Sequence, residues 1–373
     1  MREESKNKAV LIGFCGIIAT VMALTLLLPK RDFSQLEKRY LQSAPPLTGK
    51  TLLSGEFTDD AEKYMADHIV GRDVLVGLNA YWELLTSRQA AGDIYAGKDG
   101  YLFEKPIDPS RLDQARKNVG AIENFARKIG REVDFALVPS AGFFNPEKLP
   151  DLHVAYKDDQ IVGELTDELD EGVRSVDVCR TYGEQEGLLF YKTDHHWTSL
   201  GAYEAARTYV NGKGRTMPEK NAFQITTVED FYGTSYSRSA LWLKKPDVLE
   251  LWDSGMDLDV YIGDSDTPHK GPFFMNRLEE TDKYTVFLDG NHPVVRIKNH
   301  SVPDGGELLL IRDSFGNSMA PFLAAAYSEV YCIDLRYYKG NASDLVREED
   351  FDDILVCYTL GNFAGDQNVV WLR

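Results

Sequence analysis

Apolar segments of strand length that alternate with amphipathic helices restrict the fold of this chain more than any other feature. The helical stretch Leu112–Gly130 is followed by the buried-strand run Val133–Pro139. The pattern returns later, where the apolar runs Glu307–Ile311, Val330–Leu335 and Asp353–Leu360 are separated by helical stretches. Strands that alternate with helices predict an α/β fold, with a mostly parallel sheet and helices on both of its faces.

Between these stretches the pattern changes. Residues 187–191 are a further apolar run, and residues 200–211 are helical, with Thr198 or Ser199 as the expected N-cap. Residues 212–300 contain short β-prone runs without the helical alternation. They predict a β-rich insertion that serves as a lid or as a wall for substrate.

Polar residues follow three of the apolar runs. The tetrad Asp194–Trp197 follows residues 187–191, Asp313 and Ser314 follow the run that starts at Glu307, and Asn362 follows the last run. Ligands collect at the carboxyl ends of the strands in parallel sheets. The sequence therefore predicts that these three segments meet in one site.

The residue types in these segments fit nucleophilic catalysis. Ser314, at a strand-to-helix junction, is the candidate nucleophile, although serine is also a common helix N-cap. His196 is the candidate general base, and Asp194, two residues earlier, can orient its imidazole. The backbone N–H of Ser314 and the side-chain amide of Asn362 are candidate oxyanion donors; a turn position after Gly361 is the alternative for Asn362.

The other members of the tetrad have less specific interpretations. His195 points away from His196 on an extended segment, so it is expected to pack or to make a structural hydrogen bond. Trp197 is either a platform for a sugar or a buried residue. Asp194 and the two histidines could bind a metal, but no further clustered His or Cys supplies the missing ligands. The sequence contains no GxSxG, HExxH, P-loop or EF-hand pattern, and we expect no metal and no cofactor.

An apolar run near the N-terminus is long enough to cross a bilayer. Ala9–Leu28 contains no charged residue, and Lys6, Lys8, Lys30 and Arg31 flank it. The Pro-Lys-Arg-Asp sequence that follows Leu28 is a poor cleavage site. It favours an uncleaved signal anchor over a removed signal peptide. The uniform apolarity of the run and its position near the N-terminus argue against a buried core helix.

The anchor defines an expected organisation of the chain. Basic residues lie on both sides of the run, so its position near the N-terminus is the reason to expect the body outside the cytoplasm. The expected segments are a cytoplasmic tail at 1–8, an anchor at 9–28, a polar tether at 29–55 and a catalytic domain at 56–373.

The net charge of −18 excludes some partners. It repels phosphate backbones, so nucleic acid is not expected as a partner, and it disfavours docking of the soluble part on anionic lipid. A neutral sugar chain is unaffected. Cys179, Cys332 and Cys357 do not form a disulfide or metal-binding pattern and are expected as free thiols.

The tetrad Asp194–Trp197 resembles the signature of the DHHW family, bacterial relatives of the SGNH-hydrolase-like alginate O-acetylation proteins. Further segments resemble family segments in the expected order, so the resemblance extends over about residues 33–373: Gly97–Phe103, Val138–Ser140, Pro146–Pro150 and Ile311–Asn317. It implies a flavodoxin-like SGNH fold with Ser314, His196 and Asp194 as the triad. The order of the motifs is permuted relative to ordinary SGNH hydrolases, and Asn362 falls where those enzymes carry their oxyanion Asn, without the usual Gly-x-Asn-Asp context.

We therefore expect an extracytoplasmic serine acyl-ester enzyme, an O-acetyltransferase or acetylesterase acting on a cell-surface or secreted polysaccharide. The resemblance implies a multi-pass membrane acyltransferase as partner. Arg312 and Asn317, which flank Ser314, are candidate substrate-binding residues, together with Trp197. Two alternatives remain at this point: a non-catalytic glycan-binding or assembly subunit with an idle triad, and a metal-dependent hydrolase.

Overall fold

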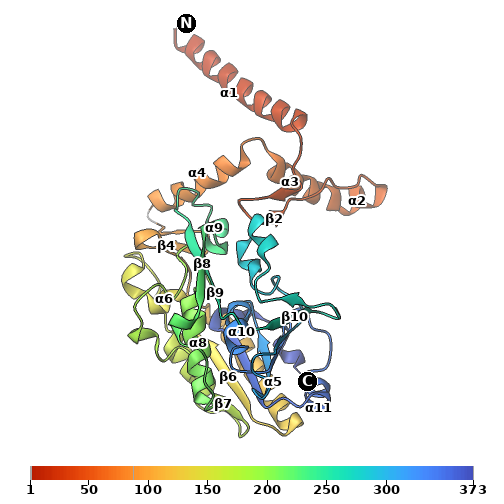
Figure 1. Cartoon of the computed structure of the whole chain (residues 1–373). Coiled ribbons are helices and arrows are strands. Elements are labelled where there is room, and N and C mark those ends of the chain that lie inside the picture. The colour runs from red at the N-terminus through yellow and green to blue at the C-terminus, as the bar shows by residue number, and fades with distance from the viewer. Residues whose placement is uncertain (1, 87, 373) are drawn as a thin grey trace. The chain divides into compact units, whose positions relative to one another are not determined.

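The computed structural model describes residues 2–86 and 88–372 (Figure 1). The chain forms two compact units, Met1–Gly92 with Ser237–Trp242, and Asp93–Tyr236 with Leu243–Arg373. The division falls after Gly92 rather than at residue 55. Within the first unit, the indole N–H of Trp242 donates to the carbonyl of Asp73 at 2.9 Å, which ties the segment Ser237–Trp242 to this unit.

The first unit begins with the apolar helix α1 (Arg2–Leu27). Within Ser5–Leu27, an 18-residue window has a mean hydropathy of 2.5, so this helix is long and apolar enough to cross a membrane. The segment expected as a tether, 29–55, contains two short paired strands and a helix. The remaining elements of this unit are β1 (Phe33–Ser34), β2 (Arg39–Tyr40), α2 (Gly49–Ser54), α3 (Glu56–His68), α4 (Arg72–Leu85) and β3 (Ala90–Ala91).

The second unit is built on an eight-stranded sheet with the order β11-β10-β12-β14-β13-β15-β6-β7. The five strands from β14 to β7 are parallel, and β12, β10 and β11 extend the sheet in antiparallel fashion. The strands are β6 (Val133–Val138), β7 (Val173–Ser175), β10 (Leu258–Ile262), β11 (His269–Lys270), β12 (Val294–Asn299), β13 (Glu307–Arg312), β14 (Glu329–Ile333) and β15 (Asp353–Thr359).

Part of the predicted insertion belongs to this sheet. Residues 212–300 are rich in strands, as expected, but β10, β11 and β12 lie within the central sheet. In the second unit, two hairpins lie outside the central sheet: β4 (Ile94–Ala96) with β5 (Leu102–Glu104), and β8 (Gln224–Phe231) with β9 (Asp247–Asp253). Of these, β8–β9 belongs to residues 212–300.

Side chains alternate between two cores because successive residues of a strand point to opposite faces. Leu308 and Leu310 pack with α8 and α10, whereas Leu309 and Ile311 pack with α5, α11 and α12. Helices thus cover both faces, as predicted. The helices of the second unit are α5 (Leu112–Ile129), α6 (Ala141–Phe144), α7 (Asp158–Thr166), α8 (Ser199–Gly212), α10 (Gly316–Leu323), α11 (Ala342–Glu348) and α12 (Leu360–Gly365); α9 (Thr234–Ser239) spans the division between the units.

The apolar run at 187–191 does not form the strand expected from the sequence. It makes an isolated bridge between Phe190 and Trp197, and the Phe190 ring packs against Phe144. The sheet edge beside β6 is occupied by β7 instead. The tetrad therefore lies in a loop that leads into α8, whose N-cap Thr198 accepts the N–H of Gly201 at 3.3 Å.

Candidate active site

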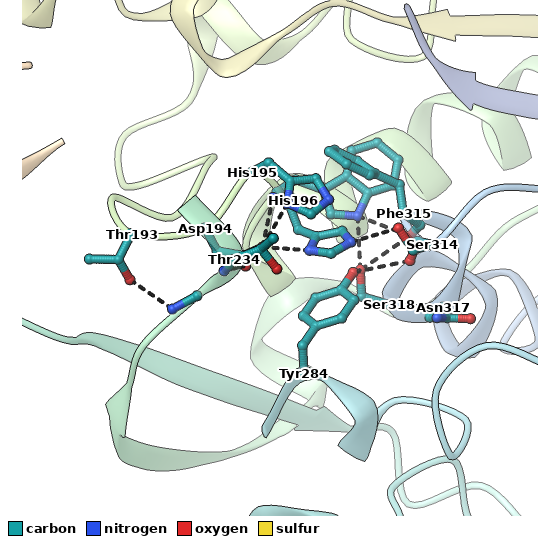
Figure 2. A network of polar contacts seen from close by, with 12 residues as sticks. Thr193, Asp194, His195, His196, Thr234, Tyr284, Ser314, Phe315, Asn317 and Ser318 are labelled. Carbon is teal, nitrogen blue, oxygen red and sulfur yellow. Dashed lines mark hydrogen bonds and ion pairs between the residues drawn. The ribbon is translucent and has the colours of Figure 1, made fainter. Parts of the chain in front are cut away.

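His196 connects the tetrad to Ser314 (Figure 2). Its Nδ1 lies 2.5 Å from Asp194 Oδ1, and its Nε2 lies 2.8 Å from Ser314 Oγ. An ionised carboxylate can only accept, so Nδ1 carries the proton and Nε2 accepts the hydroxyl of Ser314. The structure thus brings together, in one line, the three residues that the sequence singled out.

The electrostatics favour a carboxylate beside a neutral imidazole. Burial raises the pKa of Asp194, but attraction from His196 and His195 and the hydrogen bonds from His196 and Thr234 hold that pKa well below its ordinary range. Burial and then repulsion from His195 lower the pKa of His196, despite the adjacent carboxylate. The exposed fraction rises from 1% at Asp194 to 5% at His196 and 8% at Ser314, so the hydroxyl is the part nearest to solvent.

The loop after β8 holds the carboxylate of Asp194. Asp194 Oδ2 accepts the backbone N–H of Thr234 at 2.6 Å, and Oδ1 accepts the backbone N–H of His196 at 2.9 Å. A Cβ on Gly233 would lie 2.1 Å from the Cβ of Asp194. Only glycine fits there, because no other residue allows the backbone to approach so closely.

Asp247, on β9, fixes the residue before Asp194. Its carboxylate accepts the N–H of Lys192 at 3.0 Å and both the N–H and the hydroxyl of Thr193, at 2.7 and 2.6 Å. The Thr193 hydroxyl in turn accepts the N–H of Gly233 at 3.2 Å. The β8–β9 hairpin therefore holds the tetrad from two sides.

Tyr284, in the short helical turn Lys283–Val286, stacks on the imidazole of His196. The ring centroids are 3.8 Å apart, and the planes are inclined by 11°. The phenol oxygen lies 2.9 Å from Ser318 Oγ and donates to the carbonyl of Ser314 at 3.4 Å. Burial holds the pKa of Tyr284 well above its ordinary range, so the phenol stays protonated. Tyr284 thus fixes the imidazole plane and contacts the backbone of the serine.

A strained turn follows Tyr284 and leads into β12. Three successive residues, Leu288–Gly290, have positive φ angles of 56°, 62° and 86°, a conformation that costs energy for residues other than glycine. Arg277 anchors the turn through Nε at 2.6 Å from Asp289 Oδ1. Beyond it, Asn291 Oδ1 accepts the side-chain amide of Asn317 at 3.0 Å. Asn317, expected to bind substrate, thus has a structural partner in the wall of the site.

Asp313 ties the end of β13 to the end of β15. One carboxylate oxygen accepts the N–H of Phe315 at 3.0 Å. The other accepts the N–H and the hydroxyl of Thr359, both at 2.9 Å, and the amide of Asn362 at 2.8 Å. The candidate oxyanion residue Asn362 is therefore near the serine segment, with one of its two amide hydrogens engaged by Asp313.

Arg312 lies beneath this segment rather than in reach of a substrate. The side chain is fully buried, with Nη1 3.5 Å from Asp334 Oδ2. A Cβ on Gly316 would lie 2.7 to 2.8 Å from three side-chain carbons of Arg312, so the start of α10 rests directly on it. The substrate-binding role expected for Arg312 does not fit this position.

Trp197 is also fully buried. Its indole N–H donates to Ser318 Oγ at 2.8 Å and to the carbonyl of Phe315 at 3.2 Å. It offers no open ring face to a sugar. The buried alternative for Trp197 therefore fits the structure, and the sugar platform does not.

Asp194, His195 and His196 present ligand atoms within 4.8 Å of one another, as a metal site would. However, both nitrogens of His196 already have partners, Asp194 on one side and Ser314 on the other. A metal ion would compete with the serine for Nε2. The donor set fits a proton relay better than a metal centre.

Three supporting residues were missed from the sequence: Gly233, Asp247 and Tyr284. The segment that contains Gly233 reads as an ordinary loop, and Asp247 and Tyr284 lie in the irregular region 212–300. The glycine directly before α9 is the one local signal of a close backbone approach. Nothing in the sequence indicates which distant segment it approaches.

If Trp197 is a packing residue, its truncation should cost stability. We expect Trp197→Ala to destabilise the protein by about 3–5 kcal/mol. Trp197→Phe keeps a ring and loses the N–H bond, and should cost about 1–2 kcal/mol. Thermal and urea unfolding of the full chain in detergent measure both changes. Unchanged stability with weakened sugar binding would instead make Trp197 a substrate contact.

Comparisons with known proteins identify two family matches. Residues 173–333 match the model described as DHHW protein, and residues 94–229 match the model described as SGNH hydrolase-like domain, acetyltransferase AlgX. No curated protein matches the chain.

Solved structures share the fold. A DHHW family protein from Eubacterium siraeum is 22% identical, with a TM-score of 0.65 over 74% of this chain and 94% of that one. Bacillus cereus PatB1, solved with a sulfonyl adduct, is 17% identical, with a TM-score of 0.60 over 75% of this chain and 98% of that one. The tetrad Asp194–Trp197 lies inside the first matched region, so the chain resembles the DHHW family over residues 173–333 and shares the SGNH-hydrolase-like fold of these structures.

Proposed function

We propose that this protein is a membrane-anchored serine acyl-ester enzyme that moves acetyl groups on a polysaccharide outside the cytoplasm. The proposal rests above all on the unbroken line from Asp194 through His196 to Ser314, with contacts of 2.5 and 2.8 Å. A carboxylate, a neutral imidazole and a hydroxyl in this order are what general-base activation of a serine requires.

In the first half-reaction His196 Nε2 takes the proton of Ser314 as Oγ attacks the carbonyl carbon of an acetyl ester. The carbonyl oxygen becomes an oxyanion. When the intermediate collapses, the bond to the alcohol oxygen breaks and the imidazolium returns its proton to that oxygen. The product is an acetyl ester on Ser314, and Asp194 stabilises the imidazolium throughout.

In the second half-reaction a hydroxyl resolves the acetyl-enzyme. A sugar hydroxyl gives its proton to His196 and attacks the acetyl carbon, and the Ser314 oxygen leaves and recovers the proton. With water in place of the sugar, the same steps release acetate. Candidate oxyanion donors are the N–H of Ser314, two residues before α10 begins, and the second amide hydrogen of Asn362.

The comparisons support this chemistry at the level of the group. The matched description over residues 94–229 names an acetyltransferase, and PatB1, which shares the fold, was solved with a sulfonyl adduct. A polysaccharide acceptor and a multi-pass membrane acyltransferase as acetyl donor are further parts of the proposal. The apolar helix α1 supports a single-pass anchor in the same membrane.

The acyl-enzyme is the decisive species to detect. The full chain in detergent is mixed with an acetyl-ester reporter, and the peptide that contains Ser314 is examined by mass spectrometry. We expect a gain of one acetyl group on Ser314. Ser314→Ala should gain none, and His196→Ala should lose reporter turnover by on the order of 10⁴-fold or more.

A neighbouring serine provides the matched control. Ser318 lies one helical turn from Ser314 on the same peptide, and Ser318→Ala should still carry the acetyl group at Ser314. Adding oligosaccharides then separates transfer from hydrolysis, because the acetyl group appears either on sugar or as acetate. A folded wild-type protein that forms no adduct with several esters would point to the non-catalytic glycan-binding subunit.

Tyr284 should act as a positioning residue for His196. Tyr284→Phe keeps the stacked ring and loses the phenol hydrogen bonds, so we expect kcat to fall about 3- to 10-fold. Tyr284→Leu removes the ring face as well and should lower kcat/KM by on the order of 100-fold. Steady-state kinetics with the ester reporter test both. Equal, small losses in the two variants would show that the stack has no role in catalysis.

The acid side of the pH profile should depend on His195. His196 must be neutral to accept the serine proton, and its pKa is lowered by burial and by repulsion from His195, while Asp194 and Asp313 raise it. Removing the imidazole in His195→Gln should raise the pKa of His196, so the acid limb of kcat/KM should move to higher pH. His153→Gln, whose imidazole contacts the carbonyl of Pro150 and is not among the groups that shift the pKa of His196, is the control and should leave the limb in place. A shift to lower pH in His195→Gln would contradict this account.

A further inference from the structure

Helix α4 exposes a continuous apolar stripe to solvent. At 100° per residue, five side chains fall within an arc of about 100° that contains no charged residue. All five are between 51% and 79% exposed. The stripe consists of Val74, Leu75, Leu78, Trp82 and Leu85.

The opposite face of α4 is already packed within its own unit. Gly77 and Ala80 are buried there. A Cβ on Gly77 would lie 2.6 Å from the indole of Trp242, so this face has no room left. The stripe is therefore not the core-facing side of the helix, and it is more apolar than a solvent-facing helix side needs to be.

The start of α4 is joined to the end of the apolar helix α1. The N–H of Val70 donates to the buried Thr25 Oγ1 at 3.1 Å. Arg31 Nη1 pairs with Asp73 Oδ2 at 3.0 Å, and the imidazole of His68 contacts the carbonyl of Arg31 at 3.1 Å. The C-terminal end of α1 and the N-terminal end of α4 are therefore adjacent in space. The stripe starts within one turn of this joint.

A cavity of about 310 Å³ at the joint has an amphipathic lining. Apolar groups in the lining include Leu24, Leu28 and Val74, and the polar or charged ones are Thr25, Lys30, Arg31, Asp67, His68, Arg72 and Asp73. Such a lining fits the boundary between lipid chains and headgroups, where apolar surface and cationic or polar groups lie side by side.

We propose that α4 is an interfacial helix whose apolar stripe lies in the outer leaflet of the bilayer that α1 crosses. The inference rests on the membrane location of the proposed function and goes beyond it. Trp82 and the leucines match the composition of interfacial helices. The stripe carries no cation and the chain has a net charge of −18, so the contact is apolar and does not require anionic lipid.

Site-directed spin labels can test this in the full chain, reconstituted in phosphatidylcholine vesicles. Cys15, on α1, is exposed, and the other three cysteines are buried. The wild type therefore accepts a label on the anchor. In a Cys15→Ala background, Leu78→Cys places a label on the stripe, and Asn79→Cys places one at the next, polar position of the same helix. Power saturation with oxygen and with a water-soluble nickel chelate measures the depth of each label.

We expect the Leu78→Cys label to have a severalfold higher ratio of oxygen to nickel accessibility than the Asn79→Cys label. Equal ratios, both typical of water, would overturn the proposal. Shielding of the Leu78→Cys label from both reagents would also overturn it, in favour of a second copy of the chain. A Cys15 label in lipid together with a Leu78→Cys label in water would refute only the interfacial position of α4. A Cys15 label in water would refute the membrane location, and the ester assay would still report on the catalytic proposal.

Discussion

Asp194 accepts three N–H groups, from His196 backbone, His196 Nδ1 and Thr234, in a place that solvent does not reach. A buried carboxylate without such partners would cost several kcal/mol, so the fold must deliver all of them. This requirement explains why the backbone of Gly233 packs directly against Asp194, and why Asp247 accepts two hydrogen bonds from Thr193. It also sets the state of His196, since the carboxylate holds one ring nitrogen protonated and leaves the other to face Ser314.

The serine segment follows the same design. Asp313 gathers four donors from Phe315, Thr359 and Asn362, and so fixes the ends of two adjacent parallel strands relative to each other. Hydrogen bonds to a charged acceptor contribute more than neutral ones, about 1.5–3 kcal/mol each. Two buried carboxylates, one for each segment, therefore hold the nucleophile and its base at bonding distance, although 118 positions separate them in sequence.

Much of the fold and of the site could be predicted from local sequence patterns. The parallel strands β13, β14 and β15, the helices between them and the tetrad Asp194–Trp197 all have clear local patterns. The strand predicted at residues 187–191 is wrong, because an apolar run fits a buried loop as well as a strand. The edge of the sheet beside β6 is occupied by β7 instead. Tyr284 could not be found because its role comes from stacking on a ring that is distant in sequence, which no periodicity records. Trp197 and Arg312 illustrate the converse, since proximity to a site in sequence does not imply exposure in it.

The joint between α1 and α4 affects how this protein would encounter other proteins of the same membrane. A flexible tether as long as residues 29–55 would let a domain sample a radius of about 30 Å. The hydrogen bonds of Thr25 and Arg31 remove that freedom from the first unit. With α1 in a bilayer, another protein of the same membrane reaches this unit by lateral diffusion alone, and neither partner pays the entropy of closing a long loop. Encounter then becomes a two-dimensional search, whose rate depends on surface density rather than on bulk concentration.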